Sequence, residues 1–203
     1  MTIKKKSVSE LKREAIIEAS IEEFLDKGFQ KANMDAIARR ANVSKRTVYN
    51  HFSSKDELFK LITLQTWEQG KAATHYPFNP ALSVSVQLTD IAQMELELWR
   101  APRFIDLSRV LFGEFFHQSE LSSDVMDIIA ASNSTLNDWM AEAVSAGALN
   151  IDDIPRACKQ FTALLKAFGY WPQLMLRAKA PLEEEEKSII ESAIGMFLNT
   201  YRA

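Results

Sequence analysis

Apolar residues along this 203-residue chain recur mostly at intervals of three or four positions, which is the spacing of one helix face. The first such segment begins near Ser9 and stops at Gly28, a residue type that commonly ends helices with a left-handed backbone. Only six glycines and six prolines occur, so long uninterrupted elements are expected. The segment 82–88 alternates like a strand, but it also fits one helix face that continues to Leu98, and no partner strand is evident. We therefore predict an all-α protein of about nine helices.

Capping residues, glycines and prolines divide this pattern into separate helices. Asn33 can cap a short second helix over 34–41, and Ser54 begins a Ser-x-x-Glu capping box at the start of the fourth. The stretch 75–80 is the clearest break in the chain, and we expect a domain hinge near it. The other predicted helices cover about 45–52, 82–100, 102–116, 122–146, 153–180 and 182–202, with the eighth helix kinked around Gly169 and Pro172.

The net charge of −3 hides an uneven distribution along the chain. Residues 1–60 contain 13 Lys and Arg against 9 Asp and Glu, a balance of +4, which leaves a balance of −7 for the remainder. A basic first third on an acidic body indicates that the first third binds a polyanion.

Other features of the composition narrow the class of protein. Cys158 is the single cysteine, so no internal disulfide can form and a reducing compartment is favoured. No apolar run approaches the roughly 20 residues of a membrane span. The basic N-terminus is not followed by the apolar region of a secretory signal. We expect a cytoplasmic protein that does not contact the membrane.

The segment 42–58, NVSKRTVYNHFSSKDEL, combines many hydrogen-bond donors with a few apolar residues. On a short helix, Val43, Val48 and Phe52 can pack toward supporting helices while the polar residues between them face outward. Such a helix fits the major groove of DNA and can present side chains of its first turn to base edges. Asn42 precedes the helix and tolerates the positive φ that a tight turn requires.

The span 12–61 resembles the DNA-binding domain of TetR-family transcriptional regulators. The matching segments are AIIEASIEEFLDKGF at 15–29, MDAIARRANVSKRTVYNHF at 34–52 and SKDELF at 54–59. The resemblance implies an N-terminal three-helix helix-turn-helix domain over 1–60, with its motif at about 33–52. It also implies a larger C-terminal helical bundle over 61–203 for effector binding and dimerisation.

Residue by residue, the resemblance implies contacts with double-stranded DNA. The implied DNA-binding residues are Asn33, Met34, Ser44, Lys45, Arg46, Thr47, Tyr49, Asn50, His51 and Lys55. Lys45, Arg46 and Asn50 are the candidates for base edges, because Arg and Lys pair with guanine and Asn with adenine. The others would cap the recognition helix or contact the phosphate backbone. Asn42 stands where the family usually has Gly, and its tolerance of positive φ accommodates this difference. Arg46 stands where Gly is frequent, so the base preference of other members does not transfer.

For the C-terminal region, the resemblance implies a homodimer on a palindromic operator, usually a repressor, that a small-molecule effector releases. The family places a ligand cavity between the connecting helix and the next three helices, where the candidates are Trp67, Met94, Leu98, Phe112, Phe116 and Trp139. The last two helices form the family's dimer interface, where the candidates are Phe161, Leu164, Leu165, Ile189, Ala193, Ile194 and Phe197. No cluster of Arg or Lys is obvious among the pocket candidates, so an apolar or aromatic effector is expected.

Two other classes of protein remain as alternatives. An enzyme on an all-helical scaffold would have to use His51, His75, His117, Cys158 and scattered acids. The sequence has no metal-ligand spacing, phosphate-binding loop or nucleophile motif, and we therefore expect no cofactor and no metal. A DNA-architectural protein without effector control could use the same motif. The acidic overall charge argues against it, because non-specific DNA binding depends on positive charge.

Overall fold

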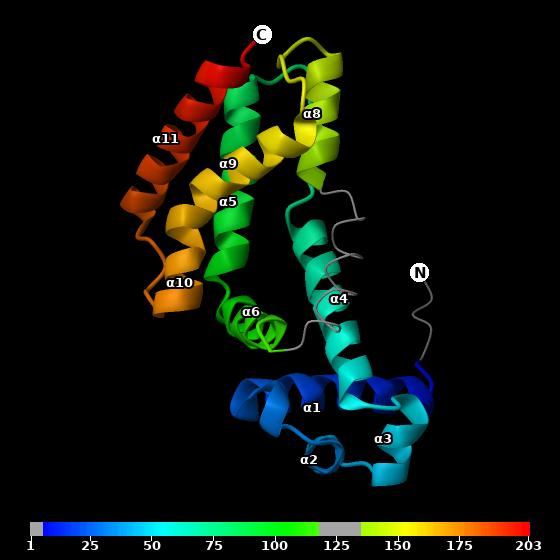
Figure 1. Cartoon of the computed structure of the whole chain (residues 1–203). Helices are drawn as coiled ribbons and strands as arrows, with labels where there is room; N and C mark the ends of the chain where they lie inside the picture. Colours follow the sequence, from blue (N-terminus) through cyan, green and yellow to red (C-terminus); the bar gives the residue numbers. More distant parts are fainter. Residues whose placement is uncertain (1–5, 118–134) are drawn as a thin grey trace. The chain divides into compact units, whose positions relative to one another are not determined.

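The computed structural model describes residues 6–117 and 135–203, and Figure 1 shows that these residues form helices joined by short connections. The helices are α1 (Val8–Lys31), α2 (Met34–Arg40), α3 (Lys45–His51), α4 (Lys55–Ala73), α5 (Val84–Arg100), α6 (Pro102–Phe115), α8 (Thr135–Ser145), α9 (Ile154–Gly169), α10 (Trp171–Leu176) and α11 (Glu183–Tyr201). The predicted all-α class is confirmed. The segment 82–88 leads into α5 and is not a strand, because Ser83 caps that helix by accepting a hydrogen bond from the Val86 N–H at 3.3 Å.

The predicted cap residues begin their helices as expected. The Asn33 side chain accepts a hydrogen bond from the Ala36 N–H at 2.9 Å, and the Ser54 hydroxyl accepts one from the Glu57 N–H at 3.1 Å. The carboxylate of Glu57 accepts its bond from the Ser53 N–H at 2.7 Å. The reciprocal half of the capping box is therefore displaced by one residue toward the N-terminus.

The structure refines the predicted ends of two helices, and a third predicted helix lies partly outside the described residues. Gly28 has the expected positive φ of 73°, and its backbone interrupts the first helix with a kink; its ψ of 160° is not that of a left-handed cap, and α1 continues beyond the kink to Lys31. The predicted eighth helix is two helices, because Tyr170 leaves helical geometry between α9 and α10. Of the predicted helix 122–146, the structure describes α8 only, and residues 122–134 lie outside the described residues.

The described residues group into two compact units, 6–67 with 106–117 and 68–105 with 135–203. The core of the first unit is an aromatic cluster in which the Phe29 ring centroid lies 4.8 Å from Phe59 and 5.5 Å from Phe24. Leu107 and Leu111 of α6 are buried in the same core, so the first unit includes a helix from well beyond residue 60. The predicted division at residue 60, between a DNA-binding domain and a domain for effector binding and dimerisation, stays a prediction.

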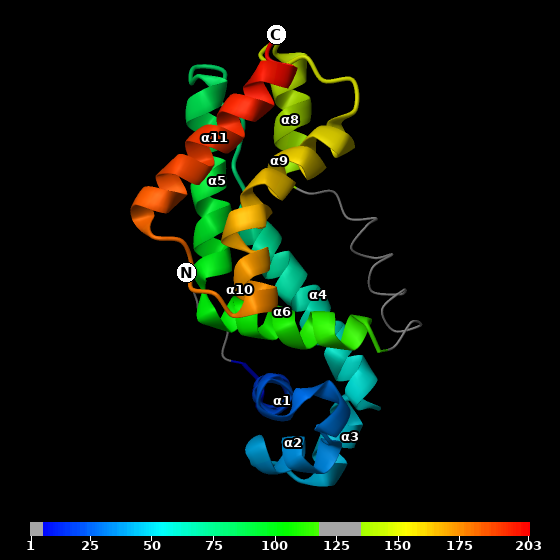
Figure 2. The ribbon, with the colours of Figure 1, turned by 60° about the vertical axis from the view of Figure 1, so that its left-hand side comes forward.

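The second unit is built around α9, which packs against α5, α8 and α11; Figure 2 shows α5, α9 and α11 side by side. The Phe161 ring of α9 meets the Phe197 ring of α11 at 5.3 Å between centroids. At the end of α9, Gly169 lies so close to α5 that an added Cβ would be 2.2 Å from Cδ2 of Leu96. A larger residue at this position would force the Leu96 side chain to move.

Candidate functional site

The recognition helix α3 is held by a turn before it and by apolar contacts beneath it. Asn42 has a φ of 52°, as the turn was predicted to require, and the Ser44 hydroxyl accepts a hydrogen bond from the Thr47 N–H at 3.1 Å. Val48 and Phe52 are buried in the core of the first unit, and Val43 packs partly buried against it. The predicted anchors are thus confirmed, and the opposite side of α3 is left to solvent.

An ion-pair cluster joins α2 to α1. Nε of Arg40 donates to Oε2 of Glu23 at 2.8 Å, and its Nη2 donates to Oδ2 of Asp26 at 2.6 Å. The hydrogen bond that Arg40 donates to the buried Glu23 carboxylate is the largest of the effects that raise the pKa of Arg40. Sequence reasoning missed this cluster, although Glu23 and Asp26 lie close together on one side of α1. The cluster stabilises the α1–α2 pair on which α3 rests.

Six of the ten predicted DNA-binding residues have exposed side chains. Asn33, Ser44, Lys45, Arg46, Tyr49 and Asn50 are exposed, whereas Thr47, His51 and Lys55 are partly buried and Met34 is buried. Tyr49 retains 47% of its surface exposed, so its ring and hydroxyl are accessible to a ligand. The Met34 side chain belongs to the core, so only its backbone is available to a ligand.

Two of the predicted cations already have partners within the first unit. Nζ of Lys55 donates to the carbonyl oxygens of Phe29 at 2.8 Å and Gln30 at 3.2 Å, and it lies 4.4 Å from the centroid of the Phe29 ring. Lys55 thus satisfies carbonyl oxygens in the last turn of α1. Its contact with phosphate stays a prediction. Nζ of Lys45 lies 2.8 Å from Oδ1 of Asp35 on α2, and this hydrogen bond raises the pKa of Lys45.

The predicted effector-pocket residues are distributed over both units. Trp67, Phe112 and Phe116 belong to the first unit, and Met94, Leu98 and Trp139 belong to the second. Phe116 is 77% exposed, whereas Trp139 is buried and donates from its indole N–H to Oε1 of Gln87 at 3.2 Å. Trp139 therefore serves the core of the second unit, where its hydrogen bond satisfies the buried indole.

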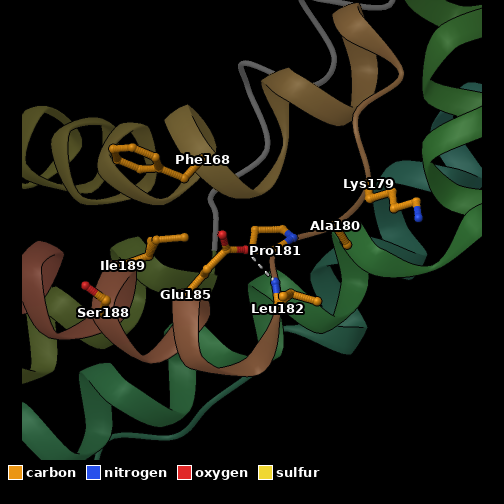
Figure 3. A pocket seen from close by; sticks show the side chains of 8 residues that line it. All are labelled: Phe168, Lys179, Ala180, Pro181, Leu182, Glu185, Ser188 and Ile189. Carbon is orange, nitrogen blue, oxygen red and sulfur yellow. Dashed lines mark hydrogen bonds between the residues drawn. The ribbon is translucent and has the colours of Figure 1, made fainter.

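A pocket that the sequence did not predict lies beside α9 and α11 (Figure 3). Its lining residues are Phe168 of α9, Lys179, Ala180, Pro181 and Leu182 of the α10–α11 connection, and Glu185, Ser188 and Ile189 of α11. The Glu185 carboxylate accepts a hydrogen bond from the Leu182 N–H at 2.8 Å and so shapes the turn into α11. Of the residues predicted for a pocket or an interface, only Ile189 lines this described pocket.

Most of the residues predicted for a dimer interface are interior in a single chain. Phe161, Leu165, Ala193, Ile194 and Phe197 are buried, and Leu164 and Ile189 are partly buried. The larger apolar side chains that remain exposed on α9 and α11 are Phe168, 59% exposed, and Met196, 57% exposed. These two residues are not among the interface candidates predicted from the sequence.

Ionisable groups inside the second unit have displaced pKa values. Burial raises the pKa of Glu95 on α5 to about 6, and the nearby Lys166 opposes this rise. Burial likewise lowers the pKa of Lys166, whose ammonium lies 5.7 Å from the Trp99 ring and 5.5 Å from the Tyr170 ring. Burial raises the pKa of Cys158 to about 12, so this thiol is not a reactive nucleophile at neutral pH.

Residues 6–117 and 135–203 lack two kinds of feature. This part of the chain contains no group of three or more His, Cys, Asp or Glu side chains placed to hold a metal ion. None of its helices combines the length and the apolar character that a membrane crossing requires.

Comparisons with known proteins agree with this geometry. Residues 16–62 match the model of bacterial regulatory proteins of the tetR family, and residues 86–203 match the C-terminal domain of AefR-like transcriptional repressors. The chain is 27% identical to the HTH-type transcriptional regulator SrpR of Pseudomonas putida, over 97% of this chain and 88% of that protein.

Solved structures extend the likeness to nearly the whole chain. A TetR family regulator from Pseudomonas syringae pv. tomato is 37% identical, with a TM-score of 0.81 over 94% of this chain and 96% of the other. The Flavonoid-responsive Regulator FrrA is 27% identical, with a TM-score of 0.75 over 94% of this chain and 97% of the other.

The exposed recognition helix and these matches define a helix-turn-helix transcriptional regulator that binds DNA. The chain belongs to the TetR family. This membership excludes the enzyme alternative, because TetR-family proteins are regulators of transcription and not enzymes.

Proposed function

We propose that this regulator is a cytoplasmic repressor that binds an inverted-repeat operator as a homodimer and leaves it when a small apolar or aromatic effector binds. The observation that carries the proposal is the outer face of α3. Lys45, Arg46, Tyr49 and Asn50 are exposed there, while Val48 is buried on the opposite side. A short helix held in this way can enter a major groove without losing its packing.

The outer face of α3 carries side chains that suit base edges and others that suit phosphate oxygens. Arg46 has the planar donor fork that pairs with guanine O6 and N7, and Asn50 can pair with adenine N6 and N7. Ser44, Thr47, Tyr49 and His51 carry hydroxyl or imidazole groups that can bind phosphate oxygens at the rim of the groove. Asn33 and the backbone of Met34 stand at the start of α2, where N–H groups favour an anion.

The dimer is proposed to form through the outer sides of α9 and α11. Phe168 and Met196 are exposed there, and Leu164 and Ile189 are partly exposed beside them. A stable interface buries a core of such apolar side chains within a polar rim. Two recognition helices related by a two-fold axis would then read two half-sites of one operator.

Replacing Met196 with Asp is expected to raise the dimer dissociation constant at least about 100-fold, because a charge buried without a partner costs several kcal/mol. Sedimentation velocity at micromolar concentrations would measure the change. Met175→Asp is the matched control, because Met175 is exposed on α10 and not on the α9–α11 face. Equal dissociation by both variants, or by neither, would contradict the proposed interface.

The effector class rests on composition and on one relative. FrrA, 27% identical over most of its length, is described as responsive to flavonoids, which are planar aromatic molecules. The match of residues 86–203 to AefR-like repressors supports repression as the sign of regulation. The helix α4 has residues in both compact units, so we propose that it carries the response of the second unit to the recognition helix.

The proposal is tested by selecting DNA from a randomised duplex pool with the full-length protein. We expect an enriched inverted repeat bound by two chains, with affinity at least about 1,000-fold above that for the unselected pool. Addition of a planar flavonoid is expected to release the operator. Binding without any enriched sequence would favour the architectural alternative, and enrichment with no release by aromatic compounds would overturn the effector class alone.

A further inference from the structure

The two neighbouring cations at the start of α3 have different surroundings. Nζ of Lys45 lies 2.8 Å from Oδ1 and 3.0 Å from Oδ2 of Asp35, in the first turn of α2. Among the described residues, no ion pair to the next residue, Arg46, is found. The Lys45 and Asp35 side chains are both more than half exposed, so DNA can reach the pair without any unfolding.

The Asp35 carboxylate changes which DNA groups suit the Lys45 ammonium. An ammonium has three N–H donors, so Lys45 can keep its bond to Asp35 and still donate to another acceptor. A phosphate oxygen is a poor second acceptor, because its negative charge would lie close to the carboxylate. The O6 and N7 atoms of guanine are neutral acceptors and bring no such repulsion.

We propose that Asp35 is a specificity-determining residue that directs Lys45 away from phosphates and toward base edges in the major groove. The inference rests on the proposed binding of α3 to an operator. In duplex that lacks a suitable base, Lys45 makes no strong contact and the Asp35 carboxylate repels the backbone. Asp35 thereby weakens binding to non-operator DNA more than binding to the operator.

The inference is tested with Asp35→Asn, which keeps the shape of the side chain and removes its charge. We expect affinity for an unselected 30-base-pair duplex pool to rise about 3-fold per chain, and about 10-fold per dimer, because each released lysine gains one phosphate contact. The slope of log affinity against log salt should steepen by about 0.9 per chain. Affinity for the selected operator should change less, so the ratio between the two duplexes should fall.

Two further variants separate this role from simpler ones. In the Lys45→Gln background, Asp35→Asn should have less than half of its effect, because the freed ammonium is absent. Glu68→Gln makes the same change in charge on exposed α4 surface and should leave the ratio unchanged. If Asp35→Asn changes only thermal stability, or alters both duplexes equally, or acts equally without Lys45, the inference is wrong. If the wild-type protein enriches no operator, the proposed function itself fails.

Discussion

Replacing Arg46 with Ala is expected to weaken operator binding by about 30-fold to 25,000-fold at constant salt concentration. A bidentate contact between arginine and guanine is worth about 1–3 kcal/mol, and a symmetric dimer loses this contact twice. Arg46 is exposed on α3, while Val48 of the same helix is buried in the core. The substitution should therefore leave folding and dimerisation unchanged, which circular dichroism and sedimentation would verify.

The Arg46→Ala variant is also expected to bind a changed set of DNA sequences. Selection with the Arg46→Ala variant should give an operator that no longer prefers one base at one position of each half-site. Arg39→Ala is a matched control, because Arg39 is also exposed but lies in the last turn of α2. Its loss should change affinity several-fold at most and should not alter the preferred sequence. Similar effects of both variants on preference would contradict the role of Arg46.

Replacing Phe59 with Ala is expected to reduce the free energy of unfolding of the first unit by about 3–5 kcal/mol. Phe59 is fully buried, and its ring centroid lies 4.8 Å from Phe29 and 6.3 Å from both Phe24 and Phe115. The side chain thus contacts rings of two other helices, α1 and α6, and a cavity at this point cannot be filled by the movement of one neighbour.

Urea denaturation would measure this loss with separate reporters for the two units. Trp67 reports on the first unit, whereas Trp99 and Trp139 report on the second, so variants that retain one reporter separate the two transitions. The first transition should move to lower urea and the second should not. Phe116→Ala is the matched control, since Phe116 is 77% exposed, and its effect should stay within about 0.5 kcal/mol. A comparable loss in the control would show that the cluster is not the core of the unit.

The sequence by itself determined the elements of this protein, because the signals that define them are local. Asn33, Ser44 and Ser54 are caps whose side chains bond to backbone groups three residues away, so the motif is readable without the rest of the chain. Asn42 takes the positive φ for an equally local reason. The family resemblance over 12–61 added the DNA-facing assignment of the residues that α3 exposes.

Only the tertiary structure decided which apolar face of a helix is internal. On α9 and α11 more than one face is apolar, and the contact between Phe161 and Phe197 shows which faces meet within one chain. Periodicity gives the angle between two stripes on a helix, but not the direction from which the neighbouring helix approaches. Phe168 and Met196 could be assigned to an outer surface only after that direction was known.

Long-range polar contacts were likewise decided by the tertiary structure. Lys55 meets the end of α1 some 25 residues earlier in the chain, and Lys45 meets Asp35 across the turn between α2 and α3. A charged side chain on an exposed helix has many possible partners, and the chain's path in space selects one of them. The sequence therefore identified the helix that can read DNA, whereas the fold determined which partners Lys45 and Lys55 have within the chain.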